Sequence, residues 1–241
     1  MGETLGYPEL ILIPGGPFTM GSDPAADGYA YADEGPQHQV DVADFYMARY
    51  PVTNTEYGRF LEATGHRVPP HLQSRYKPMC EPTHPVVWVS WEDANAYCRW
   101  LSGETGRAYR LPSEAEWEKA ARGTDGRLYP WGDEAPDRGR CAFANDEGAT
   151  TTPVGRYSPQ GDSPYGCADV AGNVWEWCHS LYRAYPYDPD DGREDPAASG
   201  PRVLRGGAFY TNFRRVRCAS RLRYSPHLWL NVIGFRVCVA A

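Results

Sequence analysis

Glycine and proline occur along the whole chain, and this distribution excludes long uninterrupted helices and strands. The 241 residues include 25 Gly and 22 Pro, and both residue types interrupt regular structure in most contexts. The same chain is 41% hydrophobic and 13% aromatic, which favours a packed core over disorder. Because no linker, repeat or low-complexity tract divides the sequence, we expect residues 1–241 to form one loop-rich domain.

Only a few segments show the signals of regular structure. Two short apolar runs within residues 10–22, separated by a Pro-Gly-Gly turn, predict strands, and a third strand is expected through residues 40–47. Helices are predicted where a Ser, Thr or Asn cap precedes apolar residues at three- and four-residue spacing. They begin near residues 53, 90 and 113, and the last two end near Gly103 and Gly123. From residue 124 onward, turn residues predict loops and short strands.

Charge and hydropathy restrict the class of protein. A formal charge of -7 argues against general nucleic-acid binding. No apolar run approaches the roughly 20 residues of a membrane helix, and the first residues lack the pattern of a signal peptide. We therefore expect a cytoplasmic protein with no membrane span. The seven Cys have no zinc-ligand spacing, so buried reduced thiols are expected, with a disulfide of Cys141 left as an alternative.

Five groups of residues are more specific than composition. They are PGGPFTMGS at 14–22, YPVTN at 50–54, RLPSEAEWE at 110–118, AGNVWEW at 171–177, and RGGAF at 205–209 together with IGFR at 233–236. In this order the chain resembles the formylglycine-generating-enzyme family, also called the sulfatase-modifying-factor domain. The resemblance implies an α+β, C-type-lectin-like single domain with few helices, short strands and much irregular loop. Such a fold does not by itself define a function.

The resemblance also implies a test for catalysis. Active members oxidise a substrate cysteine with copper held by two thiolates that follow the Gly-Gly of the C-terminal motif. Here Thr211 occupies the place expected for the first thiolate, and no cysteine follows until Cys218, which matches a separate structural position. Because Cu(I) is held by soft sulfur ligands, no copper is expected. The alternative is an oxidase or maturation enzyme of the same family that uses other residues.

The stretch between Arg205 and Arg236 has an unusual mixture of bulky, polar and apolar residues without helical or strand periodicity. It resembles the variable region of diversity-generating-retroelement proteins, in which asparagine codons are rewritten at their first two bases. That process permits Phe, Tyr, Ser, Leu, His, Thr, Asn and Val, and Trp229 is the exception. The candidate variable residues are Tyr210, Thr211, Asn212, Phe213, Ser220, Leu222, Tyr224, Ser225, His227, Leu228, Trp229, Leu230, Asn231 and Val232.

This resemblance predicts a non-enzymatic protein that displays a diversified surface, about residues 205–236, to an unknown protein or cell-surface ligand. A fixed frame would carry the surface, as antibody loops are carried by their sandwich. The expected frame residues are Arg205, Gly206, Gly207, Arg217, Cys218, Ala219, Pro226, Gly234 and Phe235. The alternative is that the apolar members form a core-facing loop.

Two further sets of residues are candidates for binding an ion or a ligand. The resemblance implies a structural calcium loop with ligands from Ala171, Asn173, Val174 and Glu176, and a less certain second site near Asn145, Asp146, Gly155 and Tyr157. The alternative to the first site is that Glu176 pairs with an arginine. Arg214, Arg215, Arg217, Arg221 and Arg223 form a basic cluster, which fits either an anionic ligand or buried arginines bonded to loop carbonyls.

Overall fold

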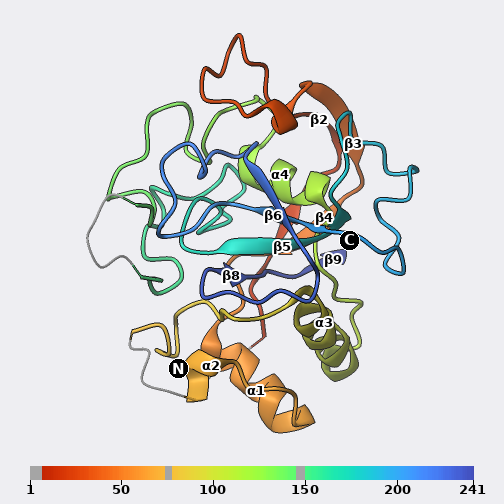
Figure 1. The fold of residues 1–241 in the computed structure, drawn as a ribbon, viewed down its shortest axis with the longest axis vertical. Coiled ribbons are helices and arrows are strands. Elements are labelled where there is room, and N and C mark those ends of the chain that lie inside the picture. The colour runs from red at the N-terminus through yellow and green to blue at the C-terminus, as the bar shows by residue number, and fades with distance from the viewer. Residues whose placement is uncertain (1–6, 74–77, 145–149) are drawn as a thin grey trace.

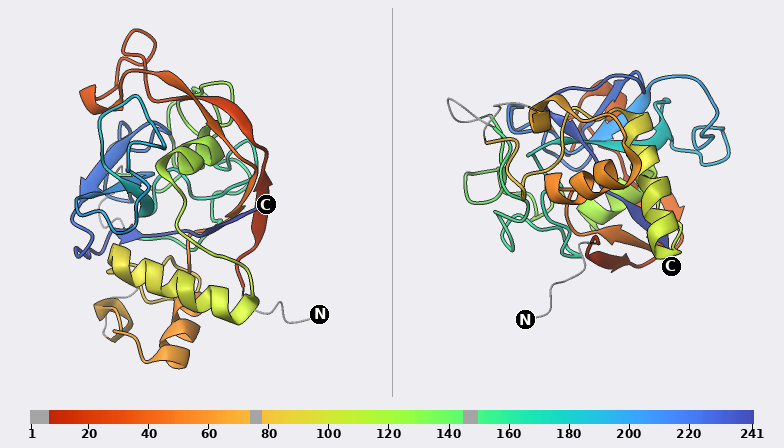
Figure 2. Two further views of the ribbon diagram at one scale, coloured as in Figure 1. Left: turned by 90° about the vertical axis from the view of Figure 1, so that its right-hand side faces the viewer. Right: turned by 90° about the horizontal axis from the view of Figure 1, so that it is seen from below.

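The computed structural model describes residues 7–73, 78–144 and 150–241, in which short helices and strands are joined by long irregular segments. The helices are α1 (Asn54–Thr64), α2 (Pro70–Gln73), α3 (Trp91–Thr105) and α4 (Glu114–Arg122), with a 3-10 helix, η1 (Ala32–Glu34). Among the described residues, none of these helices has the length and apolar character needed to cross a membrane. α1, α2 and α3 lie together at one end of the molecule (Figures 1 and 2).

The described strands form three small sheets. The first is β1 (Leu10–Ile13), β4 (Phe45–Ala48) and β9 (Cys238–Ala240), and the second is β2 (Gly16–Met20) with β3 (His38–Val42). The third has the order β7 (Arg221–Tyr224), β6 (Arg202–Arg205), β5 (Trp175–Leu181) and β8 (Ile233–Gly234). Because β4 lies between β1 and β9, segments from the two ends of the chain meet in one sheet.

Helix boundaries follow local capping chemistry. Thr53, Ser90 and Ser113 each begin a helix with a capping box, in which the cap side chain and the third helical residue bond each other's backbone. α4 ends at Gly123 as predicted. α3 does not end at Gly103, however. It continues to Thr105 and stops at Gly106, whose left-handed backbone terminates the helix.

The single strand predicted through residues 40–47 is wrong. The chain leaves β3 after Val42 and enters β4 at Phe45, and these two strands belong to different sheets. The Asp44 carboxylate at the break accepts a hydrogen bond from the Gly15 backbone N–H at 2.5 Å. The mostly apolar run of residues 40–47 therefore contains a change of sheet.

Buried arginines order the loops between these elements. Arg202, Arg205, Arg217, Arg221 and Arg236 are all almost completely inaccessible to solvent. Arg202, for example, donates four hydrogen bonds of 2.8 to 3.2 Å to backbone carbonyls. Three of these carbonyls belong to the irregular segment 195–198, so this backbone can be buried without loss of hydrogen bonding.

Candidate ligand-binding face

Both ends of the candidate variable region are attached to β5. Within that strand, Glu176 is in register with Arg205 of β6 on one side and with Gly234 of β8 on the other. β7, which lies inside the region, pairs with the outer edge of β6. The chain therefore leaves the sheet after β6, rejoins it as β7, and returns at β8 beside β5.

The turn after β6 requires glycine. Gly207 has a φ of +75°, and a Cβ atom there would lie 2.7 Å from the Arg215 carbonyl oxygen and 2.8 Å from Val216. A larger residue would be strained and would also collide with the backbone that follows. The close packing of these two segments explains the Gly-Gly of the motif.

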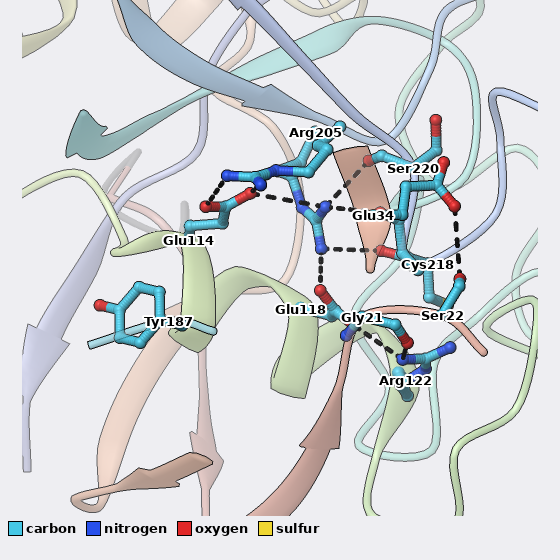
Figure 3. Close-up of polar contacts among 12 residues, drawn as sticks. Gly21, Ser22, Glu34, Glu114, Glu118, Arg122, Tyr187, Arg205, Cys218 and Ser220 are labelled. Atoms are coloured by element: carbon cyan, nitrogen blue, oxygen red, sulfur yellow. Dashed lines mark hydrogen bonds and ion pairs between the residues drawn. The ribbon is translucent and has the colours of Figure 1, made fainter. Parts of the chain in front are cut away.

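Arg205 joins the far side of the region to α4. Its guanidinium donates to the carbonyl oxygens of Cys218, Ala219 and Ser220 at 2.9 to 3.1 Å. The same group forms an ion pair with Glu118 of α4, and Figure 3 shows it lying between the helix and the loop. Arg205, one of the expected frame residues, therefore holds the backbone of this loop in position from beneath.

Two more arginines of the region are buried against carboxylates. Arg221 forms a bidentate pair with Glu114, with contacts of 2.8 and 2.7 Å. Arg217 contacts Asp27 at 2.5 Å and both oxygens of Glu34 at 2.8 Å. Burial raises the pKa of Glu34 although Arg217 acts in the opposite direction. Within the basic cluster, Arg217 and Arg221 therefore have a structural role.

Backbone hydrogen bonds fix the last loop before β8 to the rest of the molecule. The Trp91 N–H donates to the Pro226 carbonyl at 3.0 Å, and the Trp88 N–H donates to that of Leu230 at 2.9 Å. The expected frame residues are buried, except for Pro226, which is half-buried. These two bonds thus hold the backbone of the loop without involving its candidate variable side chains.

Most of the candidate variable side chains reach solvent, and we call this set the C-terminal face. Its exposed members are Tyr210, Asn212, Ser225, His227, Trp229 and Asn231, and its half-buried members are Phe213, Leu222, Tyr224, Leu228 and Leu230. Tyr210 is 50% exposed and Trp229 is 43% exposed. The alternative of a core-facing loop fits Leu222, Tyr224 and Leu230, which are half-buried and pack against the main hydrophobic core. It does not describe Tyr210 or Trp229.

Three candidate residues must be removed from the face. Thr211, Ser220 and Val232 are buried. The Thr211 hydroxyl closes a turn, because it accepts from the Ala208 N–H at 3.0 Å and donates to the Ala208 carbonyl at 2.9 Å. Val232 belongs to the main hydrophobic core. These side chains support the frame and cannot contact a ligand directly.

A loop near the N-terminus adds aromatic residues that the sequence analysis missed. Tyr29, which is 44% exposed, meets the ring of Phe213 edge to face at a centroid distance of 4.9 Å. The Arg215 guanidinium lies 3.9 Å from the ring centre of Tyr31. More than 180 residues separate these partners in sequence, and no local pattern could have connected them.

A cavity of about 520 Å³ lies beside the end of the C-terminal face. The variable candidates Ser225 and His227 line it together with Trp91 and Glu92 of α3. His227 Nδ1 lies 2.8 Å from a Glu92 carboxylate oxygen. The hollow thus combines candidate variable residues with frame residues.

The described cysteines are reduced, and most of them are buried. All seven cysteines are free, including Cys141, and every one except Cys80 is buried. Burial raises the pKa of Cys141 and of Cys218 to about 12, so neither forms a thiolate readily. In the parts of the chain that the structure describes, no group of three His, Cys, Asp or Glu residues could hold a metal ion.

The structure corrects the assignment of Glu176 as a calcium ligand. Both of its carboxylate oxygens accept hydrogen bonds from Arg236 at 2.7 Å, and one also accepts from the Trp117 indole at 2.7 Å. The Asn173 amide is paired with the backbone of Thr152 through both its oxygen and its nitrogen. Since calcium needs several free hard oxygens, these side chains do not fit the ion.

At the first calcium site, the backbone carbonyls of Ala171 and Val174 were the other expected ligands. They are therefore without the side-chain ligands expected beside them. At the second site, Asn145 and Asp146 lie outside the described residues. The Gly155 N–H donates to the Asp169 carboxylate at 2.6 Å. Burial raises the pKa of Asp169 to about 6.

Comparisons with known proteins agree with the resemblance seen in the motifs. Residues 2–241 match the family described as "Sulfatase-modifying factor enzyme 1-like domain". The chain is 34% identical to "Formylglycine-generating enzyme" of Streptomyces coelicolor, over 94% of this chain and 87% of that protein. It is 37% identical to "Serine/threonine-protein kinase Pkn1" of Chlamydia trachomatis over 95% of this chain, which spans only 38% of that protein.

Solved structures share the fold. "Structure of PvdO from Pseudomonas aeruginosa" matches with a TM-score of 0.85 and 31% identity, covering 97% of this chain and 95% of that one. "Treponema denticola variable protein 1" matches with a TM-score of 0.78 and 22% identity, covering 99% and 98%. At that identity, the second likeness concerns the fold alone. The predicted C-type-lectin-like, formylglycine-generating-enzyme-type fold is confirmed.

Proposed function

Because the chain belongs to the sulfatase-modifying factor enzyme 1-like family, we propose that it is a non-enzymatic member that binds a protein or cell-surface ligand through its C-terminal face. One observation carries the proposal. Exposed side chains of residues 210–231 project from a backbone that is fixed by buried residues such as Arg205 and Arg221. A surface built in this way can change its side chains while the fold stays the same.

The chemistry of the face suits recognition. Tyr210 and Trp229 present large, rigid, amphipathic side chains to solvent, and Tyr and Trp are the residues that dominate binding energy at protein interfaces. Burial, and after it the Coulombic effect of Tyr224, raise the pKa of Tyr210. Except for Trp229, the residue types at these positions are also those that rewritten asparagine codons permit, so we include diversification by a retroelement in the proposal.

The candidate copper position supports a role without oxidation. Thr211 uses its hydroxyl to close a turn, and the thiols of Cys141 and Cys218 are buried with raised pKa values. Copper oxidation of a thiol requires accessible soft ligands. Position 211, which is a threonine, lacks such a ligand.

A displayed library tests the separation of face and frame. The eleven face positions would be randomised together in the full chain on yeast, with a second library randomised at buried Thr211, Ser220, Val216 and Val232 as the control. We expect most face variants to remain displayed and folded, and selection on a model globular protein to yield binders. If the face library unfolds as often as the control library, the proposal is wrong.

The flanking DNA tests the origin of the face. A near-duplicate of the last coding stretch with Asn codons at the face positions, beside a reverse-transcriptase gene, would support diversification. A neighbourhood with neither would leave a binding protein of fixed specificity and would remove the retroelement from the proposal.

A second candidate function follows from the relatives. Since a relative 34% identical over most of the chain is named a formylglycine-generating enzyme, an oxidase that uses other residues is the competing proposal. Oxygen uptake with a cysteine-containing peptide, measured with and without added copper, separates the two. Turnover above the copper-only background would favour the enzyme, and its absence would favour the binding protein.

A further inference from the structure

The C-terminal face continues onto the loop between β2 and β3. Tyr29 packs against Phe213, and the Arg214 guanidinium lies over both rings, 5.3 Å from the centre of Tyr29 and 5.8 Å from that of Phe213. Arg215 lies over Tyr31 in the same way. Aromatic and cationic side chains from the two segments therefore form one continuous surface.

Buried ion pairs fasten the loop in this position. Arg217 contacts Asp27 and Glu34, which lie on either side of the two tyrosines, and also donates to the Tyr29 carbonyl at 3.0 Å. Asp27, Glu34 and Arg217 are each less than 4% exposed. The loop is thus held as rigidly as the frame of the face itself, so Tyr29 and Tyr31 are preorganised for contact.

The same burial leaves the surface positive. The carboxylates of Asp27, Glu34 and Glu114 are buried beneath the surface. They form ion pairs with Arg217 and Arg221. In the described part of the chain, no ion pair engages Arg214, Arg215 or Arg223. Arg214 and Arg223 are exposed, and Arg223 lies 4.4 Å from the ring centre of Tyr182.

The exposed carboxylates of the β2–β3 loop are Asp23 and Asp33. Asp33 accepts a hydrogen bond from the Tyr182 hydroxyl at 2.5 Å, and Glu92 contacts His227 at the far edge. The rest of the molecule is acidic, since the chain carries a formal charge of -7. An anionic partner would be repelled elsewhere and attracted here, which gives electrostatic orientation to the encounter.

We propose that the binding surface includes Tyr29 and Tyr31 beyond the C-terminal face, and that it recognises an acidic patch on a partner protein. This inference rests on the proposed binding function. Guanidinium groups held over aromatic rings match carboxylates in a bidentate manner, and the rings supply the apolar contact that surrounds such pairs. Long polyanions fit less well, because the exposed cations are few and are separated by bulky apolar side chains.

Peptide selection on the full chain provides the test. A phage-displayed random dodecapeptide library is the probe, and enriched peptides are then measured against single variants. We expect enriched peptides to contain more Asp and Glu than the unselected library. Arg214→Gln combined with Arg223→Gln should weaken their binding about tenfold or more, and Tyr29→Ala should weaken it as much as Phe213→Ala.

Matched controls lie away from the face. Leu12 is 46% exposed, so Leu12→Ala removes a comparable apolar side chain and should change nothing. Arg107 is exposed and lies over the ring of Tyr46, so Arg107→Gln removes a stacked guanidinium elsewhere and should also have no effect. Circular dichroism confirms that each variant is folded.

The other outcomes overturn the inference in distinguishable ways. Peptides without an acidic excess that lose binding in Trp229→Ala would leave the binding function intact and remove the acidic partner. Unchanged binding in Tyr29→Ala would remove the extension of the surface. Tighter binding to heparin than to any peptide would make the partner a polysaccharide. No enrichment at all would count against the proposed function itself.

Discussion

Arg236 and Glu176 form a completely buried bidentate pair, with Nε to Oε2 and Nη2 to Oε1 both at 2.7 Å. The pair connects the end of the C-terminal motif to β5. We predict that Glu176→Gln destabilises the protein by about 3 to 5 kcal/mol, because it leaves a buried guanidinium without a counter-ion. Urea unfolding at pH 7 measures the loss.

The same pair predicts the response to calcium. Because Arg236 already uses both Glu176 oxygens, adding millimolar calcium or removing it with a chelator should leave the midpoint of thermal unfolding unchanged. An increase of several degrees with calcium that disappears in Glu176→Gln would show that the ion displaces the arginine, contrary to this expectation.

Arg217 should control the order of the loop that carries Tyr29. We expect Arg217→Met to cost about 3 to 5 kcal/mol, since Asp27 and Glu34 are then buried without their partner. Amide hydrogen exchange should accelerate most in residues 25–34. The matched change, Arg214→Met at an exposed position, should stay within about 0.5 kcal/mol of the parent. Equal effects of the two changes would refute the structural role of Arg217.

His71 should make the protein sensitive to acid. It is buried between Asn54, which accepts from Nε2 at 2.9 Å, and the ring of Trp88, and burial lowers its pKa to about 4. A folded-state pKa below the unfolded value of about 6.5 means that the neutral form is stabilised in the fold. The contribution is therefore complete above pH 6.5 and is lost as the pH falls towards 4, by roughly 3 kcal/mol.

The difference between two variants isolates this effect. Unfolding free energy would be measured from pH 7 to pH 4.5 for His71→Gln and for His227→Gln, whose imidazole is 81% exposed. The first variant should lose part of the pH dependence, and the second should follow the parent. If the slopes of all three proteins coincide, His71 is not the group responsible.

Substitution to asparagine should separate face from frame. Tyr210→Asn and Trp229→Asn remove side chains that are about half exposed, and each should cost less than about 1 kcal/mol. Val232→Asn places an amide in the main core and should cost about 3 kcal/mol or more. Thermal unfolding of the three variants measures the contrast, and a severe loss in either aromatic variant would place that residue in the core.

Sequence patterns anticipated features that depend on neighbouring residues. The Ser113 and Glu116 capping box and the stop at Gly123 were predictable, because the bonds involved span only a few positions. Gly103 failed as a helix end because a glycine inside a helix and one beyond it look alike until the backbone is known. Of these two glycines, only Gly106 has the left-handed conformation.

Features that depend on packing were not predictable. An irregular stretch has no period from which to infer direction, so buried Thr211 and Val232 could not be distinguished from exposed Tyr210 and Trp229. Tyr29 joins the surface through contacts with Phe213 and through Arg217, whose carboxylate partners lie 183 and 190 residues away. In the arginine cluster, Arg217 and Arg221 are buried in ion pairs, which fits the structural interpretation. Arg214 and Arg223 are exposed, and an anionic ligand for them stays a proposal.

Restoring one thiol at position 211 should not restore a copper site. The Thr211 side chain is buried, and its hydroxyl bonds both the N–H and the carbonyl of Ala208. In Thr211→Cys, the larger and weaker-bonding sulfur disturbs this turn at a cost of about 1 kcal/mol. We expect burial to raise the pKa of the new thiol, as it does for Cys141 and Cys218, and one thiol leaves Cu(I) without the second soft ligand.

Competition with a chromophoric Cu(I) chelator should therefore give the same copper affinity for Thr211→Cys, for Thr211→Ser and for the parent. A gain in affinity confined to Thr211→Cys, with oxygen uptake on a thiol peptide, would instead show that a second ligand is within reach and would favour the enzyme.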